Sequence, residues 1–180
     1  MKIHSRLRAA SSAMCIAAAA VFSAGAQGAP NHKDRPFEAT LKIFESVTFT
    51  GAMPCFAIGL ISGSGEGSHV GELKARSRDC INPSGVFDPN GPTAYRFTSG
   101  TGLDGLVFVA ANGDQLFATY AGTLQPQPGG PHAVKGHFVI TGGTGRFAGA
   151  TGGGTLQGTE DISRVVIGEG EISLSGRIRY

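Results

Sequence analysis

A single acidic residue interrupts the apolar side of the first strongly patterned segment. Residues 37–49 alternate apolar and polar side chains, and this period of two predicts a β-strand with one buried face. Glu45 falls on the apolar side, whose other members are Phe37, Ala39, Leu41, Ile43, Val47 and Phe49. If this side faces an apolar interior, loss of hydration raises the pKa of the carboxyl group and makes Glu45 a candidate acid or base. The alternative is a Glu45 at the rim of the fold, hydrogen-bonded or paired with an arginine.

The first 26 residues have the features of a secretory signal peptide. Three basic residues precede an apolar run over residues 9–22, and the small residues Ala24-Gly25-Ala26 follow it. The run is short for a membrane-spanning helix, which needs about 20 apolar residues. We therefore expect cleavage after residue 26 and a secreted or periplasmic protein; a short membrane anchor is the alternative. Residues 27–36 would be a flexible lead to a domain over residues 37–180.

Cys55 and Cys80 are the two cysteines outside this N-terminal segment. In an oxidising compartment, such a pair is most simply a disulfide. It would close a loop of about 25 residues and stabilise the fold by roughly 3 kcal/mol. Neither cysteine lies in a Cys-x-x-Cys motif, which leaves a nucleophilic or metal-binding thiol as the weaker alternative.

The chain contains none of the common catalytic motifs: no Gly-x-Ser-x-Gly, no His-Glu-x-x-His and no phosphate-binding loop. Asp88 and Asn90 lie in a Pro/Gly turn, where side-chain hydrogen bonds that form the turn explain them better than calcium binding. The histidines after residue 26 do not have the spacing of a metal-binding face; they are His32, His69, His132 and His137. We therefore expect no metal and no cofactor.

Length and composition favour one β-rich domain. The chain has 180 residues, of which 29 are glycine and only 16% are charged. This composition excludes a coiled coil, a helical bundle and a charged disordered tail. Three of the 15 Lys and Arg residues belong to the expected signal peptide, so the remainder is close to neutral against 13 Asp and Glu. A near-neutral chain without basic runs is a poor nucleic-acid binder, and we expect no such partner.

Eight or nine short strands separated by turns predict a β-sandwich or a closed barrel. Asn112-Gly113 predicts a hairpin, because both central residues of its turn can take positive φ, and the glycines of 63–67 are expected to end the second strand. The expected strands are 37–49, 55–61, 70–80, 95–101, 106–110, 115–124, 133–141, 153–159 and 169–180.

Two of these strands, 106–110 and 115–121, carry apolar residues on both faces. One face can fill the interior. The other needs cover from a neighbouring subunit or from the chain's own tail. We therefore expect a homo-oligomer.

Four segments together resemble the allene-oxide-cyclase-like barrel superfamily, which includes the plant dirigent proteins. They are residues 65–71, 111–117, 140–152 and 170–176, and the most specific piece is Gly142-Gly143-Thr144-Gly145-Arg146-Phe147-Ala148-Gly149-Ala150. The chain is most similar to small secreted bacterial members. The resemblance implies an all-β fold with little helix: an eight-stranded antiparallel β-barrel of the calycin type, with an apolar interior and often assembled as a trimer.

The resemblance also implies a site. In the plant cyclases a first-strand Glu and a Pro nine residues later contribute to the cavity, and Glu45 and Pro54 have that spacing. Val47 stands where the family pattern has Asn, so the role of that Asn in holding water has no equivalent here. The expected ligand-binding residues are Leu41, Ile43, Val47, Phe49 and Pro54.

The glycines at positions 142, 143 and 145 also suggest a nucleotide-binding loop. That reading needs a following helix within a βαβ unit, whereas the remaining residues are patterned as strands. We expect instead that these glycines form a tight corner from which Phe147 plugs the barrel.

The sequence therefore predicts a secreted barrel that binds a small apolar molecule or acts as an interaction protein. One alternative is a cyclase or isomerase that uses Glu45 on a small apolar substrate. A second is a small outer-membrane barrel, since the last strand alternates apolar residues up to Tyr180. Such barrels carry aromatic girdles, and the chain has no Trp and three Tyr. We expect no stable membrane insertion.

Overall fold

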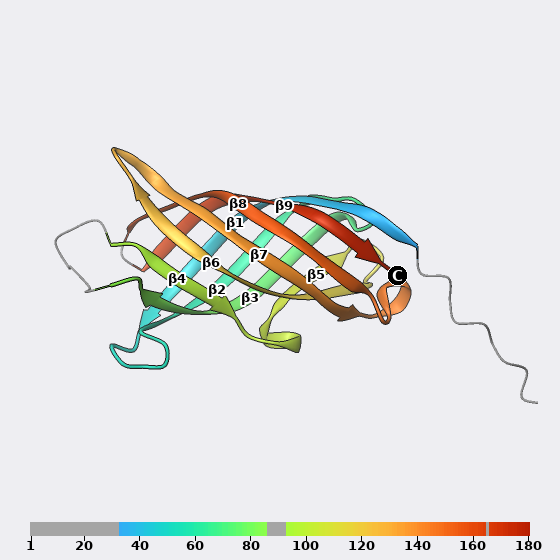
Figure 1. The fold of residues 1–180 in the computed structure, drawn as a ribbon, viewed down its shortest axis with the longest axis horizontal. Helices are drawn as coiled ribbons and strands as arrows, with labels where there is room; N and C mark the ends of the chain where they lie inside the picture. The colour runs from blue at the N-terminus through green and yellow to red at the C-terminus, as the bar shows by residue number, and fades with distance from the viewer. Residues whose placement is uncertain (1–32, 86–92, 165) are drawn as a thin grey trace, which may run out of the picture. The chain divides into compact units, whose positions relative to one another are not determined.

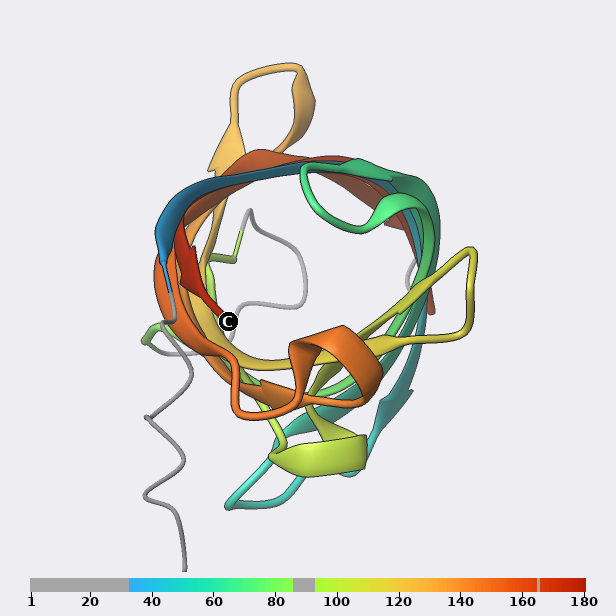
Figure 2. The same cartoon turned by 90° about the vertical axis from the view of Figure 1, so that its right-hand side faces the viewer.

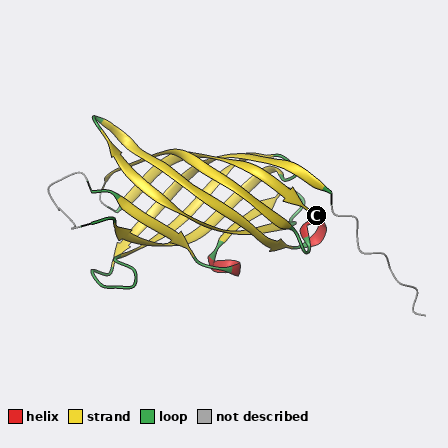
Figure 3. Ribbon diagram, in the orientation of Figure 1, coloured by secondary structure: helices red, strands yellow, loops and turns green. Residues whose placement is uncertain are grey.

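The computed structural model describes residues 33–85, 93–164 and 166–180, and most of these residues lie in strands (Figure 3). The strands are β1 (Asp34–Phe49), β2 (Ala57–Gly67), β3 (Gly71–Pro83), β4 (Tyr95–Ser99), β5 (Leu106–Ala110), β6 (Gln115–Gln127), β7 (Gly130–Gly143), β8 (Thr151–Arg164) and β9 (Ile167–Arg179). Two single-turn 3-10 helices are η1 (Gly102–Asp104) and η2 (Gly145–Phe147). No helix among the described residues is long and apolar enough to cross a membrane. The expected signal peptide, His32, Asp88 and Asn90 lie outside the described residues.

The strands close into an antiparallel barrel (Figures 1 and 2). Closure comes from β1, which pairs with β2 on one edge and with β9 on the other. One position in the wall is divided between two short strands, because β4 and β5 each pair with both β3 and β6. The barrel thus has eight strand positions built from nine strands. This confirms the expected eight-stranded antiparallel barrel and excludes the sandwich.

The strands occur where the sequence predicts them, with some ends moved. β1 begins at Asp34, inside the expected flexible lead, and Asp34 pairs with Arg179 of β9. β2 continues to Gly67, so the glycines of 63–67 do not end that strand. The reason is close approach of the neighbouring strand: a Cβ on Gly65 would lie 1.9 Å from the backbone oxygen of Thr40. Glycine here allows β1 and β2 to pack closely, which is a role that sequence alone does not separate from turn formation.

The Asn112-Gly113 pair lies in the hairpin turn between β5 and β6. Of its two residues, only Gly113 has positive φ, at 87°. The turn covers residues 111–114, as the expected strands leave it. Gly113 N–H donates to the Ala110 oxygen, and Ala110 N–H donates to the Asp114 oxygen. Asn112 acts through its side chain, whose Oδ1 accepts from the backbone N–H of Asp114 at 3.1 Å.

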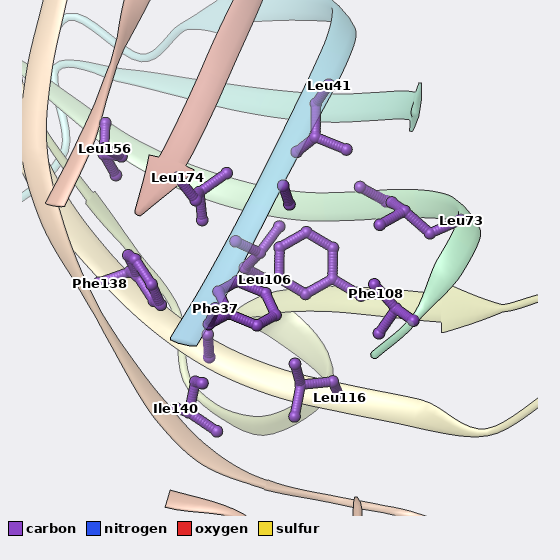
Figure 4. Packing of buried hydrophobic residues seen from close by; sticks show 14 of the residues in the cluster. Phe37, Leu41, Leu73, Leu106, Phe108, Leu116, Phe138, Ile140, Leu156 and Leu174 are labelled. Carbon is purple, nitrogen blue, oxygen red and sulfur yellow. The ribbon is translucent and has the colours of Figure 1, made fainter. Parts of the chain in front are cut away.

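Aromatic residues fill one end of the barrel interior (Figure 4). The rings of Phe37 and Phe138 lie 5.7 Å apart, and those of Phe37 and Phe108 lie 6.2 Å apart. Leu116 and Ile140 pack in the same core. These side chains pack this end of the interior as a hydrophobic core.

The corner between β7 and β8 adds one more ring to this core. Gly145 and Gly149 have positive φ there, at 56° and 74°, and η2 points Phe147 into the interior, where it is fully buried. Its ring centroid lies 5.2 Å from that of Tyr180. A strand, β8, follows the glycines, so the segment lacks the helix that a nucleotide-binding loop requires.

Part of the outer apolar face of β5 is covered by the chain itself. Val107 faces away from the core yet is fully buried. η1 packs against β5, and Arg76 Nη1 donates to the Leu103 oxygen at 3.0 Å, which holds η1 in place. Leu103 and Val139 remain exposed on the outer surface. The expected homo-oligomer stays a prediction.

The Cys55–Cys80 disulfide is confirmed. It joins the segment before β2 to β3, which is hydrogen-bonded to β2 along its length. The bond therefore fixes the β1–β2 connection against the barrel wall.

Replacing Phe147 tests whether its ring stabilises the filled end. Truncating a buried Phe removes apolar contacts and leaves a cavity, so Phe147→Ala should lower the free energy of unfolding by about 3–5 kcal/mol. Phe44→Ala is the matched control, because Phe44 is 43% exposed. Urea unfolding followed by circular dichroism gives both values. Equal losses in the two variants would contradict the assigned role.

Candidate functional site

β1 brings Glu45 into the barrel. Because side chains alternate along a strand, Leu41, Ile43 and Glu45 point to the same side. The Glu45 side chain is buried, with the residue only 5% exposed. Its hydrogen-bond partner is Glu160 of β8 and not an arginine. Glu45 thus lies in the interior instead of at a solvated rim.

Glu45 faces a cavity at the end of the barrel that the phenylalanine core leaves open. Water centres can occupy about 70 Å³ of it, which is room for several water molecules or part of a small ligand. Its walls are largely apolar and include residues from each of the strands β1 to β9. Its lining includes Leu41, Ile43, Glu45, Asp79, Tyr95, Phe97, Tyr120, Leu156 and Glu160.

Glu45 and Glu160 form a pair of carboxyl groups that shares a hydrogen bond. Such a bond requires a proton on one of the two groups. Burial raises the pKa of Glu45 from 4.5 to about 10, and the charges of Glu160 and Asp79 add to this shift. Burial also raises the pKa of Glu160, while its hydrogen bond with Glu45 lowers it. Glu45 is therefore protonated at neutral pH.

Asp79 of β3 is the third buried acid of the cavity, with 4% exposure. The hydroxyl of Tyr120 donates to Asp79 Oδ1, and Ser77 lies beside both groups, with its Oγ 3.0 Å from the Tyr120 hydroxyl. Burial raises the pKa of Asp79 to about 7, against the opposing effect of the Tyr120 hydrogen bond. Burial and the Asp79 charge raise the pKa of Tyr120, which stays a hydrogen-bond donor.

Two glycines make room for the glutamates. A Cβ on Gly59 would lie 1.8 Å from Glu45 Oε1, and a Cβ on Gly168 would lie 2.0 Å from Glu160 Oε1. Any larger residue would displace these carboxyl groups. The backbone of β2 and β9 is thus shaped around the acid pair.

The expected ligand-binding residues divide into two groups. Leu41 and Ile43 line the cavity together with Glu45. Val47, Phe49 and Pro54 lie outside its lining. Phe49, at the end of β1, packs its ring against Phe56 at 5.9 Å, and Pro54 is exposed in the segment before β2, where its backbone oxygen accepts from Asn82 Nδ2 at 2.9 Å.

Sequence reasoning missed Asp79, Tyr120 and Glu160. Asp79 had a signal, because it continues the inward series Leu73, Ala75 and Ser77 along β3. Glu160 had a weaker one, since it lies just past the predicted strand 153–159 in a glycine-rich segment without clear alternation.

Among the described residues, no group of His, Cys, Asp and Glu side chains is arranged to hold a metal ion. The three acids of the cavity are spread over β1, β3 and β8, and two of them hydrogen-bond each other. The chemistry that this arrangement offers is proton donation, proton acceptance and hydrogen bonding inside an apolar wall.

Comparison of the chain with models of known protein families gives no match, and comparison with curated proteins gives none either. The similarity to the allene-oxide-cyclase-like barrels therefore stays an expectation from sequence motifs.

The acid pair predicts that the protein loses stability as the pH rises. Folded Glu45 keeps its proton up to about pH 10, whereas in the unfolded chain it loses the proton near 4.5. The folded state thus binds more protons in this window, and the free energy of unfolding falls by at most about 1.4 kcal/mol per pH unit for each such proton. Urea unfolding between pH 5 and pH 9 should show this fall.

Glu45→Gln should flatten that dependence, because the amide cannot lose a proton in either state. Glu66→Gln is the control, since Glu66 is exposed on β2. An unchanged pH slope in Glu45→Gln would show that Glu45 does not hold the extra proton.

Proposed function

We propose that the barrel binds a small, largely apolar molecule in the cavity beside Glu45. The observation that carries this proposal is the division of the interior: aromatic side chains fill one end, while the other keeps a cavity with three acids and a tyrosine hydroxyl. Sites for small molecules commonly combine an apolar wall with a few converging polar groups. Leu41, Ile43 and Leu156 would contact the apolar body of the ligand.

The polar groups would orient that ligand. The proton of Glu45 is shared with Glu160, so the group that can accept a hydrogen bond from the ligand is Glu160 Oε1, which has no donor among the described residues. Because these groups lie in an apolar environment, a hydrogen bond that a ligand forms with them is stronger than one formed at the protein surface. The pattern selects a ligand with one polar end.

The setting we propose is an oxidising compartment outside the cytoplasm. The disulfide is consistent with that setting, since such bonds persist in secreted and periplasmic proteins. Membership of the allene-oxide-cyclase-like superfamily and assembly into a homo-oligomer belong to the same proposal. The exposed Leu103 and Val139 support assembly, because a neighbouring subunit would cover them.

A second candidate function is an acid-catalysed cyclisation or isomerisation of the bound molecule. The pKa of Glu45 favours it, because a carboxyl group that keeps its proton at neutral pH can act as a general acid. Glu45 would protonate a substrate oxygen or double bond, and Glu160 or Asp79 would accept the proton that the product releases. The cavity would hold the substrate in a folded conformation.

Glu45→Gln separates binding from catalysis. The amide keeps the size and a hydrogen-bond donor but has no acidic proton, so turnover of a converted ligand should fall at least about 100-fold while its binding changes little. Unchanged turnover would remove Glu45 from the mechanism. The ligand itself is sought by native mass spectrometry of the protein purified from its own source.

Filling the cavity tests the binding proposal. Leu156→Phe adds a ring at the cavity wall, so it should weaken the binding of neutral aromatic probes such as toluene and 2-phenylethanol at least tenfold. Gln157→Phe is the matched control, because Gln157 is the exposed neighbour on the same strand. Backbone NMR shifts report both binding and its location. Probes that do not bind the original protein, or that bind both variants equally, would contradict the cavity as the site.

A further inference from the structure

The cavity contains buried acids without a cation. Glu45, Asp79 and Glu160 are each at most 6% exposed and come from three different strands. In the described parts of the chain, no Lys, Arg or His lines this cavity. Buried acids are normally paired with a cation or kept neutral by protons. Here protons neutralise the acids, and a cationic ligand could take over this neutralisation.

One carboxyl oxygen in the cavity also lacks a hydrogen-bond donor. Glu160 Oε1 is buried, and among the described residues nothing donates to it. A buried acceptor without a partner costs roughly 1–3 kcal/mol. This oxygen lies beside Gly168, where a Cβ would come within 2.0 Å of it. A ligand that carries an N–H group would supply the missing donor.

Aromatic rings stand beside these acids. Tyr95, Phe97 and Tyr120 line the same cavity, and the rings of Phe97 and Tyr120 meet edge to face at 5.9 Å. Aromatic faces attract cations, and organic cations in particular, because their apolar parts also gain from burial. A divalent metal ion would instead require several oxygen ligands in place of these apolar walls.

We infer that the natural ligand is an organic monocation, an amine with a short apolar body whose ammonium group donates to Glu160 and Glu45 and lies against the aromatic rings. This inference rests on the proposed binding function and narrows it to one ligand class. The apolar body would contact Leu41, Ile43 and Leu156. These side chains accept any compact hydrocarbon, so they add little to the choice between ligands.

Charge balance gives this inference a distinctive signature. The empty site keeps protons on its acids, and an ammonium ion that enters it takes over their role, so a proton leaves to solvent. The titratable groups that line the cavity are Glu45, Asp79, Glu160, Tyr95 and Tyr120. Since an alkylammonium ion keeps its charge up to about pH 10, as the lysine side chain does, amine binding should tighten as the pH rises from 6 to 8.

The test compares 2-phenylethylamine with its uncharged isostere 2-phenylethanol on the full chain. We expect the amine to bind at least tenfold more tightly at pH 8, and to lose that advantage as the pH falls to 6. Calorimetry in buffers with different heats of ionisation should show proton release on amine binding and none with the alcohol.

Glu160→Gln should remove the preference for the amine, because the amide carries no charge. Its oxygen can still accept from the alcohol, so the affinity for the alcohol should change far less than the affinity for the amine. Glu169→Gln is the matched control, because Glu169 is exposed on β9 and should leave both affinities as they are. Circular dichroism establishes that both variants are folded. If Glu160→Gln does not fold, the pH dependence and proton release of the original protein decide the question.

Several results would overturn the inference. Equal or tighter binding of the alcohol would do so and leave the proposed binding function standing. An amine preference that survives in Glu160→Gln would place the cation elsewhere. Calcium binding that is lost in Glu160→Gln would assign the acids to a metal instead. If neither probe binds, the ligand class and the binding function both fail.

Discussion

A strand in a closed barrel must turn every second side chain inward, and this constraint determines where the charges of the chain can lie. A residue on the inner face has no route to solvent except through an open end. On β3 the same rule exposes Lys74, Arg76 and Arg78 and buries Ser77 and Asp79. The acids of the cavity are thus held in place by the pairing of the strands, and the protons that keep them neutral follow from that burial.

The barrel interior has two environments along its length: a hydrophobic core at one end and a cavity with acidic groups at the other. Phe37, Phe108, Phe138 and Phe147 make one end a packed hydrophobic core that stabilises the fold. This stability allows the other end to keep polar groups that are costly to bury. Gly59 and Gly168 belong to the second environment, since they give up side-chain packing to make space for Glu45 and Glu160.

Local pattern in the sequence predicted the barrel well and its site only in part. Alternation over residues 37–49 placed Glu45 on the inner face, because that pattern depends only on neighbours in the chain. Glu45 meets Glu160 because β1 and β8 both pair with β9. The register of these pairings cannot be predicted from the sequence of β1 or of β8 alone. The strand nature of residues 63–67 was missed for a similar reason, since Gly65 is explained by the approach of Thr40.

The pairing of β1 with β9 has a consequence for how the chain reaches its native state. Asp34 and Arg179 are partners, so the first and last strands of the barrel meet across nearly the whole length of the described chain. Contacts between distant residues raise the contact order and slow folding. During synthesis, β1 keeps one edge without its partner until β9 has emerged, and a free strand edge can pair with another chain. A nascent copy of this barrel therefore exposes an edge of β1 that is prone to such pairing until its final strand is made.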